Sequence, residues 1–422
     1  MMIYRFKNIL TLLFIFSLSF VKANAILVPM DVSQKNHLKA YGVSFWALEN
    51  KIIIEWLLNY QGGSFLYPYN KVIEEQLIVK GISYKVIPTV KVLQIKSEIA
   101  NPEVNMEVVQ LESAPKIAVY TPQGKQPWDD AVTLVLTYAE IPYTEIYDSS
   151  IVKGGLAEFD WLHLHHEDFT GQYGKFYRSY RGMPWYQQQV RDNEAMASKL
   201  GYSKVSDLKL AVAQNIKNYV IGGGFLFTMC SGTDSFDIAL AAQNTDICEQ
   251  MYDHDPSAPN YQSKLEYDQT FAFKDFTLEK DPMVYEYSNI DATRDHKLPE
   301  SQDKFFLFDF SAKWDVVPTM LCQNHTQVIN GFMGQTTDFR KEFIKSEVLI
   351  LGESKAFNTA RYIHGELGMG TWTFYGGHDP EDYRHMVGDP PTDLKLHPNS
   401  PGYRLILNNI LFPAAKKKKR KT

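Results

Sequence analysis

Long apolar runs are scarce in this sequence beyond its first 25 residues. No later stretch is long and apolar enough to span a bilayer, which excludes a membrane-spanning helix there. Residues 1–25 carry Arg5 and Lys7, then an apolar run, and end in Ala23-Asn24-Ala25, a pattern typical of a secretory signal peptide. No cysteine lies near that cleavage point, which argues against a lipoprotein. We therefore expect an exported protein, periplasmic or extracellular, that is cleaved near Ala25.

Positive charge is also in short supply. The net charge is −6, and nine positive charges lie in residues 1–25 and in the tail 416–422, so the remainder carries about −15. An acidic body of this kind argues against nucleic-acid binding. For the basic tail we expect a disordered end, with weak contact to an anionic surface as the alternative.

Cysteine occurs only three times, at Cys230, Cys248 and Cys322. An oxidising compartment favours paired cysteines, so an odd number leaves one thiol over. Cys248 and Cys322 form the expected disulfide pair, which leaves Cys230 free. The alternative is that all three thiols are reduced and buried.

The spacing of apolar runs predicts an α/β protein. Residues 26–112 alternate between strand-like and helix-like patterns and form an N-terminal α/β lobe. Residues 113–242 follow the rhythm of a doubly wound, mostly parallel sheet, and the pattern resumes over 346–415. Between them, residues 243–345 contain proline and asparagine turns and alternating strand-like runs, which indicate a β-rich cap inserted into the core.

One stretch organises the expected active site. A helix ends at Gly222-Gly223-Gly224, the buried strand Phe225-Leu226-Phe227 follows, and Cys230 stands in a turn before a helix that continues to Ala242. At that point the helix dipole and unpaired N–H groups favour the thiolate form of the cysteine. The sequence therefore predicts a nucleophile elbow with Cys230 as the nucleophile.

His378 is the expected partner of Cys230. It follows the strand-like run Thr371–Tyr375, and the carboxyl ends of parallel strands meet at one edge of a sheet. A cysteine nucleophile needs a base within hydrogen-bonding reach and a third group that orients the base. Three nearby carboxylates are candidates for that third role: Asp379, Glu381 and Asp382.

A second set of polar residues lies at the end of another predicted strand. We expect these four residues to bind the substrate together with Gly377: His165, His166, Glu167 and Asp168. Imidazole and carboxylate ligands suit zinc or another divalent metal, and His378 could complete such a site. Their spacing matches no metal signature, and polar residues at strand ends often bond loops, so we assign no metal and no cofactor. The aromatic loops 169–174 and 184–186 either line the substrate cleft or pack as ordinary loops.

Three segments resemble the class I glutamine amidotransferase-like superfamily, and in particular its trehalose-utilisation (ThuA-like) branch. They are the glycine-rich run before Cys230, the run Gly368–His378 that ends in Gly-Gly-His, and the closing stretch Gly402–Phe412. The likeness extends over about 116–242 and 346–412. It implies a flavodoxin-like sheet and an exported protein that acts on a small molecule, glycan or peptide.

The same resemblance implies roles for individual residues. Cys230 would attack an amide or related carbonyl, His378 would carry the proton, and the Ser231 N–H would help to hold the oxyanion. The chain departs from the family in three places: Thr228 replaces a glycine of the elbow, the acid after the histidine comes one residue later, at Glu381, and His165–Asp168 replaces the Gly-Gly oxyanion loop.

A second resemblance falls on the same spot. The run Ser231–Ser235, Ser-Gly-Thr-Asp-Ser, is similar to the pyrophosphate loop of amide ligases such as asparagine synthetase, although it is one residue short. Overall the chain also resembles an exported bacterial family often labelled asparagine synthetase B. The sequence thus leaves three functions open: a Cys-dependent hydrolase, a non-catalytic carbohydrate-binding module, and a glutamine-dependent amide ligase.

Overall fold

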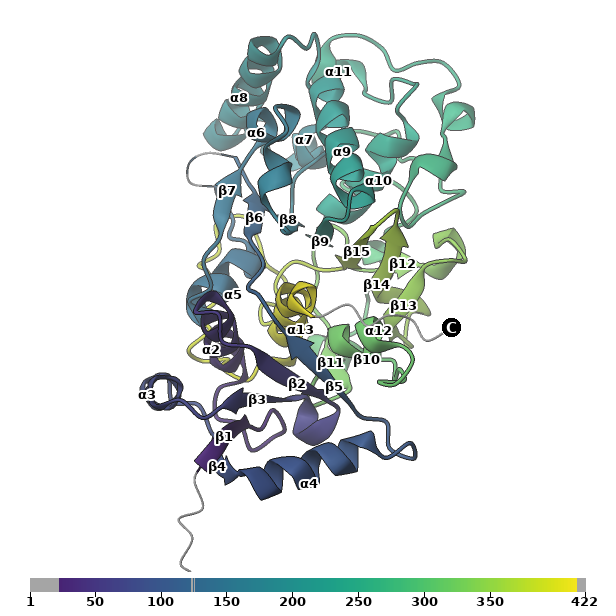
Figure 1. Cartoon of the computed structure of the whole chain (residues 1–422). Helices are drawn as coiled ribbons and strands as arrows, with labels where there is room; N and C mark the ends of the chain where they lie inside the picture. Colours follow the sequence, from purple (N-terminus) through teal and green to yellow (C-terminus); the bar gives the residue numbers. More distant parts are fainter. Residues whose placement is uncertain (1–22, 123, 125, 416–422) are drawn as a thin grey trace, which may run out of the picture.

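The computed structural model describes residues 23–122, 124 and 126–415 (Figure 1). The expected signal peptide, apart from Ala23–Ala25, and the basic tail lie outside the described residues. Two β-sheets form the frame of the molecule, a five-stranded sheet in the N-terminal lobe and a ten-stranded sheet in the core. No helix in this described part is long and apolar enough to cross a membrane.

The N-terminal lobe is an antiparallel sheet with helices on both faces. Its strand order is β4-β1-β3-β2-β5. Its elements are β1 Ala23–Val28, α2 His37–Glu49, β2 Ile54–Leu58, β3 Ser64–Pro68, α3 Lys71–Val79, β4 Lys85–Pro88, α4 Thr89–Ala100 and β5 Glu107–Leu111. Successive strand residues point to opposite faces. In β1, Ile26 therefore lies in the apolar cluster that contains α2, and Leu27 lies in the cluster that contains α4.

The core sheet joins a parallel half to an antiparallel half, so it is mixed. Five parallel strands lie in the order β7-β6-β8-β9-β15. Their bounds are β6 Ile117–Tyr120, β7 Thr144–Ile146, β8 Trp161–Leu164, β9 Phe225–Met229 and β15 Gly370–Tyr375. The antiparallel half continues from β15 through β14 Thr359–Leu367, β13 Leu349–Ser354, β10 Lys304–Leu307 and β11 Val328–Asn330, and β12 Phe339–Arg340 pairs with β14.

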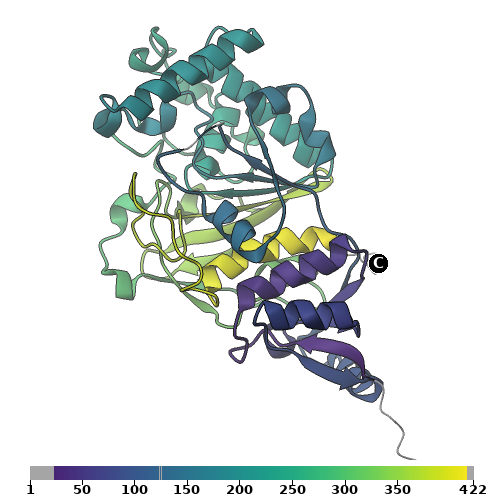
Figure 2. The same ribbon diagram turned by 90° about the vertical axis from the view of Figure 1, so that its left-hand side faces the viewer.

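Helices cover both faces of the parallel half (Figure 2). Neighbouring residues of β9 show the division: Phe227 belongs to the cluster on the side of α5 and α13, and Leu226 to the cluster on the side of α9 and α10. The helices of the core are α5 Ala131–Ala139, α6 Asp148–Val152, α7 Tyr177–Tyr180, α8 Pro184–Leu200, α9 Val205–Ile221, α10 Gly232–Ala241, α11 Gln250–Asp253, α12 Val316–Leu321 and α13 Pro401–Leu411. The expected α/β architecture is confirmed.

The segment 243–345 is not the β-rich cap that its sequence predicts. Its strands β10, β11 and β12 have nine residues in total, and they extend the core sheet instead of forming a separate one. The strand-like run after residue 270 shows the reason. Its backbone N–H groups at Phe271, Ala272 and Phe273 donate to the buried Asp237 carboxylate, at 2.7, 2.7 and 3.0 Å. A carboxylate thus takes the place of a neighbouring strand.

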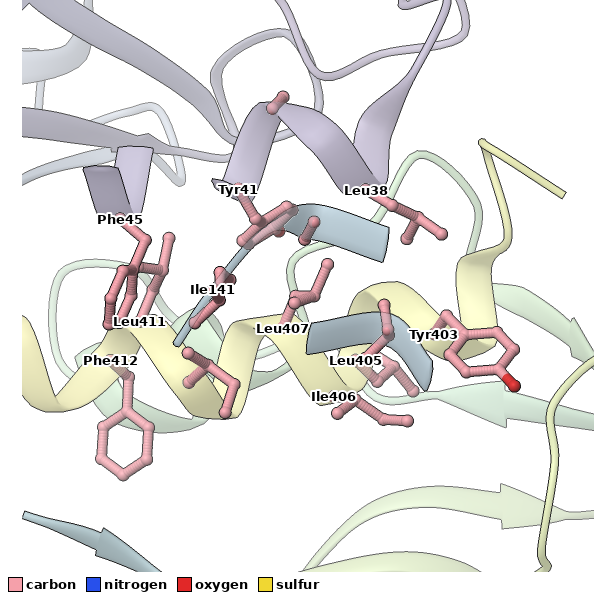
Figure 3. Packing of buried hydrophobic residues seen from close by; sticks show 14 of the residues in the cluster. Leu38, Tyr41, Phe45, Ile141, Tyr403, Leu405, Ile406, Leu407, Leu411 and Phe412 are labelled. Atoms are coloured by element: carbon pink, nitrogen blue, oxygen red, sulfur yellow. The ribbon is translucent and has the colours of Figure 1, made fainter. Parts of the chain in front are cut away.

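The N-terminal lobe and the core share one apolar interior. Helix α13 lies against α2 of the lobe, where Leu38, Tyr41 and Phe45 pack with Leu407 and Leu411 (Figure 3). Polar contacts reinforce the junction: the buried Arg404 donates from Nη1 to the carbonyl of residue 30 at 2.8 Å and from Nε to the Tyr41 hydroxyl at 3.1 Å. The lobe and the core are therefore one folding unit, not two.

Candidate active site

The carboxyl ends of β8, β9 and β15 lie side by side and bring together the side chains that can do chemistry. Such an edge is where parallel α/β sheets bind their ligands. Each strand contributes a residue just past its last paired position: His165 directly follows β8, Cys230 directly follows β9, and His378 is the third residue after β15. All three side chains are buried.

Cys230 occupies a sharp bend between β9 and α10. Its backbone φ is +50°, in the left-handed region that non-glycine residues rarely adopt. The bend is held by backbone hydrogen bonds, from the Cys230 N–H to the Gly377 carbonyl at 3.2 Å and from the Gly232 N–H to the His165 carbonyl at 2.7 Å. A Cβ on Gly232 would lie 2.6 Å from that same carbonyl oxygen, so glycine is required there. This is the geometry of a nucleophile elbow.

Two imidazoles stand next to the thiol. Cys230, His165 and His378 each offer a donor atom, and these three atoms lie within 4.8 Å of one another. His165 Nε2 is 3.0 Å from His378 Nδ1, and the planes of the two rings are tilted by 57°. The structure thus brings Cys230 and His378 together, and it adds His165 to the pair.

The Cys230 thiol is not the activated thiolate that its position predicts. Burial raises its pKa to about 11, and this outweighs the backbone N–H groups that face the sulfur and favour the thiolate. One of them, the Gln335 N–H, donates to Sγ at 3.3 Å. The helix-end effect is present but is smaller than the cost of removing the charge from water.

A carboxylate that the sequence analysis did not single out lies behind the imidazoles. Asp130 Oδ1 is 3.3 Å from His165 Nδ1, and Asp130 Oδ2 is 3.2 Å from His163 Nε2. The same side chain caps α5 by accepting from the N–H groups of residues 132 and 133. Burial acts to raise the pKa of Asp130, but His163 and His165 hold it well below its usual range. Asp130 is therefore an ionised, buried anchor for both rings.

Asp379 and Glu381 do not orient the His378 ring as expected. His378 Nδ1 faces His165, and Nε2 has no hydrogen-bond partner within the described chain. Glu381 instead pairs with His397 at 3.0 Å, and Asp379 accepts the Glu381 N–H at 2.8 Å. The turn that follows β15 points these carboxylates away from the imidazole, so the acid nearest to the paired rings comes from the start of α5.

His385 lies on the outer side of His378. The two rings stack at 4.6 Å between centroids, with planes 15° apart. His385 Nε2 is 2.7 Å from Asp129 Oδ1, and its Nδ1 is 2.9 Å from Asp382 Oδ2. Burial opposes the charge on His385, but the two carboxylates raise its pKa to about 9. Asp382, the third candidate carboxylate, therefore serves His385 instead of His378.

Three residues of this edge were missed by the sequence reasoning as site residues: Asp129, Asp130 and His385. A usable signal existed for the two aspartates, because they follow the strand at 117–120 and precede a helix, which is the position of a helix cap at a sheet edge. His385 carried no comparable signal, since it lies in irregular chain seven residues beyond His378.

Three of the four expected substrate-binding residues after β8, His166, Glu167 and Asp168, border a small cavity of about 30 Å³, and His165 does not. The cavity is lined by Pro122, Trp128, Tyr147, His166, Glu167, Asp168, Gly171, Tyr173, Gln189, Asn193, Val205 and Lys209. Burial raises the pKa of Glu167 to about 7, and the same carboxylate accepts the His165 N–H at 3.1 Å. Asp168 accepts the N–H groups of Thr170 and Gly174, so it shapes its own loop. The Gly377 N–H donates to the Thr336 carbonyl, and the Gly377 carbonyl accepts the Cys230 N–H. Gly377 does not line the cavity.

The run Ser231–Ser235 is the buried start of α10, not an open phosphate loop. The Thr233 hydroxyl donates to the Cys230 carbonyl at 2.6 Å, and the Ser235 hydroxyl donates to the Glu167 carbonyl at 3.1 Å. Ser231, Thr233 and Ser235 have no exposed surface. This placement does not support the ligase reading.

All three cysteines are free, so the expected disulfide between Cys248 and Cys322 is wrong. Each thiol has its own partner. Cys248 Sγ donates to the Thr170 carbonyl at 3.0 Å, and Cys322 Sγ donates to the Leu351 carbonyl at 3.7 Å. Counting cysteines cannot show that the two belong to different parts of the core.

Comparisons with known proteins show only distant resemblance. No protein-family model and no curated protein matches the chain. Two solved structures described as cytoplasmic proteins of Salmonella typhimurium are 10% identical to it; they match 72% and 71% of this chain and all of their own, with TM-scores of 0.35 and 0.33. A GH42 β-galactosidase from Bacillus circulans sp. alkalophilus is 10% identical over 64% of this chain and 29% of its own, with a TM-score of 0.26. At these values no family is assigned, and the function has to be argued from the site.

Proposed function

We propose that this protein hydrolyses an amide or a related carbonyl bond and uses Cys230 as the nucleophile. One observation carries the proposal: the thiol stands in a left-handed bend between a parallel strand and a helix, with nitrogens of His165 and His378 within 4.8 Å. A bend of this kind costs about 1–3 kcal/mol and persists only where the surroundings enforce it. Nucleophile and base within reach of each other are the signature of covalent catalysis.

The order of the parallel strands supports an amidotransferase-like core. The order β7-β6-β8-β9-β15 places the second strand in sequence at the edge and the first beside it, as in flavodoxin-like sheets. Cys230 follows the fourth of these strands and His378 the fifth. These positions agree with the roles that the resemblance to the ThuA-like branch implies for the two residues.

The geometry suggests the following steps. With substrate bound, the Cys230 thiol gives its proton to the neighbouring imidazole pair, and Sγ bonds to the carbonyl carbon. The developing oxyanion is held by backbone N–H groups near the sulfur, those of Ser231 and Gln335. The C–N bond then breaks, and the leaving amine takes the proton from the imidazole. Water attacks the thioester, which releases the acid and restores the thiol.

His378 is suited to accept a proton because it is neutral. Burial, together with the neighbouring His165 and His385, keeps its pKa well below the usual range. Asp130 takes the orienting role that we expected of Asp379 or Glu381, and it acts through His165. Asp130 is thus a positioning residue and does not touch the substrate.

The two other functions have less support. The cavity beside His166 has about 30 Å³, enough for one or two water molecules and too small for a sugar ring. The hydroxyls of Thr233 and Ser235 are already bonded inside the protein, and the Ser231 hydroxyl is fully buried, so none of them is presented to a pyrophosphate. The ligase function therefore rests on sequence resemblance alone, and the carbohydrate-binding function has no support at this cavity.

The test is hydrolysis of a panel of primary and secondary amides by the full chain, with released amine measured and the protein mass recorded after rapid quenching. We expect turnover, with an acyl adduct that maps to the Cys230 peptide. C230S should lower the rate by at least about 10³-fold. C248S is the matched control, since it changes another buried thiol away from this edge. Equal rates for C230S and the wild type would rule out the thiol mechanism.

A further inference from the structure

Asp130 determines which imidazole nitrogens carry hydrogen. His163 Nδ1 is 3.1 Å from the Phe227 carbonyl, which can only accept, so Nδ1 carries hydrogen, and Nε2 lies 3.2 Å from Asp130. His165 Nδ1 faces the same carboxylate at 3.3 Å and also carries hydrogen. His165 Nε2 then carries a lone pair instead of a hydrogen, and this lone pair is directed toward His378.

Three potential metal donors converge at that lone pair. They are His165 Nε2, the Nδ1 of His378 at 3.0 Å from it, and the Cys230 thiol, which lies within 4.8 Å of one nitrogen of each histidine. Two imidazoles and a sulfur are the ligand types that zinc prefers, and three protein ligands leave a fourth position open. The set is almost completely shielded from solvent, with exposed fractions of 0% for His165, 3% for Cys230 and 7% for His378.

We propose that His165, Cys230 and His378 bind a zinc-class divalent metal ion, and that this ion inhibits the protein by occupying the thiol. The metal site stands on the geometry alone. The inhibition rests on the proposed function, because it requires Cys230 to be the nucleophile.

The distance between the two histidine nitrogens fits binding to one ion after small movements of the side chains. Two nitrogens bound tetrahedrally at about 2.05 Å from the same ion are about 3.3 Å apart, close to the 3.0 Å found between His165 and His378. An imidazole binds a metal in the plane of its ring, so two parallel, stacked rings cannot share one ion. The rings of His165 and His378 are tilted by 57° and are not stacked in this way.

Two other groups of donors at this edge fit less well. Asp129, His378 and His385 also lie within 4.8 Å of one another, but the two rings are stacked 15° from parallel and cannot both point at one ion. In the group of Asp130, His163 and His165, both nitrogens of His163 already face acceptors. The first set is therefore the one that the structure favours.

Each ligating ring also has a carboxylate behind it. Asp130 Oδ1 lies 3.3 Å from the far nitrogen of His165, and Asp129 has a carboxylate oxygen within 4.8 Å of a His378 nitrogen. Outer carboxylates of this kind fix the tautomer of a ligating histidine and raise its basicity. Binding through Nδ1 would move the ring proton of His378 to Nε2, which has no hydrogen-bond partner within the described chain.

The binding reaction balances as a proton exchange. The thiol loses its proton to solvent, sulfur forms the bond to the metal, and the Gln335 N–H that already donates to Sγ remains to stabilise the thiolate. The metal withdraws electron density from the bound sulfur and occupies space that the carbonyl would need, so Sγ attacks far more slowly. Hydrolysis is then blocked until the metal is removed.

Cobalt(II) tests the site without reference to activity. The chelator-treated full chain is titrated with Co²⁺, and absorption is recorded in the visible and near ultraviolet. We expect one equivalent to bind, with a sulfur-to-cobalt charge-transfer band and displacement by Zn²⁺. C230S should abolish that band and weaken binding more than about tenfold, whereas C248S should keep both. D129N should weaken binding by about 10- to 100-fold as an outer-carboxylate variant, with circular dichroism confirming that each variant is folded.

Several results would overturn the proposal. Absence of binding, or a charge-transfer band that survives C230S, removes the site. Binding that is lost in H385A but shows no sulfur band in the wild type moves the ion to the Asp129 group. Failure of the proposed function is seen separately: a protein that binds Co²⁺ through Cys230 but hydrolyses no amide keeps the metal site and loses the inhibition. Hydrolysis that one equivalent of Zn²⁺ leaves unchanged refutes the inhibition alone.

Discussion

The Cys230 N–H donates to the Gly377 carbonyl over 3.2 Å, which ties the end of β9 to the end of β15. This bond holds the nucleophile and the base at a constant separation, since His378 is the next residue after Gly377. Gly377 has a φ of +96°, and a Cβ at this position would lie 2.5 Å from the Phe332 ring. Two independent constraints therefore exclude a side chain there.

The first prediction concerns that glycine. G377A should lower the free energy of unfolding by about 3 kcal/mol, from the left-handed backbone and from overpacking against Phe332. G388A is the matched control: Gly388 has nearly the same φ, +95°, but nothing within 4 Å of its Cβ position, so it should cost only about 1–2 kcal/mol. Urea unfolding measures both. Equal losses would mean that contact with Phe332 has no part in the effect.

The second prediction concerns a buried ion pair near the same edge. Lys209 Nζ is 2.9 Å from Asp148 Oδ2, and it also donates to the Tyr120 and Tyr147 hydroxyls. K209M leaves the Asp148 carboxylate buried without its partner, so we expect a loss of about 3–5 kcal/mol in unfolding free energy. K71A removes the exposed Lys71–Glu75 pair and should change stability by less than about 0.5 kcal/mol. A loss below 1 kcal/mol for K209M would contradict the assignment.

The third prediction concerns pH. His296 is buried between Asp303 at 3.2 Å and Asp338 at 3.0 Å. Burial opposes its charge, but the two carboxylates raise its pKa above the ordinary 6.5. A raised pKa means that the stabilisation is complete below pH 6.5 and is lost as the pH rises through the folded-state value. The midpoint of unfolding should therefore decrease as the pH rises above 6.5, and H296Q should flatten that slope.

His254 provides the control for this experiment. Its side chain is 83% exposed and lies 3.9 Å from Glu194, so H254Q should keep the pH profile of the wild type. If H296Q and the wild type lost stability in parallel, the pH dependence would arise elsewhere.

The fourth prediction concerns thiol reactivity. With its pKa raised to about 11, Cys230 should react with iodoacetamide at pH 7.5 more than about 100-fold more slowly than a free thiol. Burial raises the pKa of Cys322 and Cys248 still further, so Cys230 should be the first of the three to be labelled as the pH rises toward 10. Peptide mass mapping gives the order. Rapid labelling of Cys230 at neutral pH would show that its thiol is activated after all.

Residue patterns predicted the elbow because local chemistry determines it. Glycines before Phe225, an apolar strand and a helix start are all encoded within about twenty residues, and the structure has them at those places. The closeness of His378 followed from one general rule, that parallel strands share a carboxyl edge.

Other features depend on contacts between distant parts of the chain. The pKa of the Cys230 thiol depends on how completely the thiol is buried by residues about a hundred positions away in the sequence, such as Gln335. The acid that orients the rings comes from Asp130, which spacing around His378 cannot indicate. The strand-like run at Phe271–Phe273 fails to become a strand because Asp237 takes its N–H groups.

The packing of α13 against α2 has a consequence for the time course of synthesis. The lobe begins at the first described strand, but part of its apolar interior is supplied by residues 401–411 and its strand β5 bonds residues 414 and 415. A growing chain therefore cannot close its N-terminal lobe until residues 401–415 have been made. Until then the apolar face of α2 lacks the partner that α13 provides.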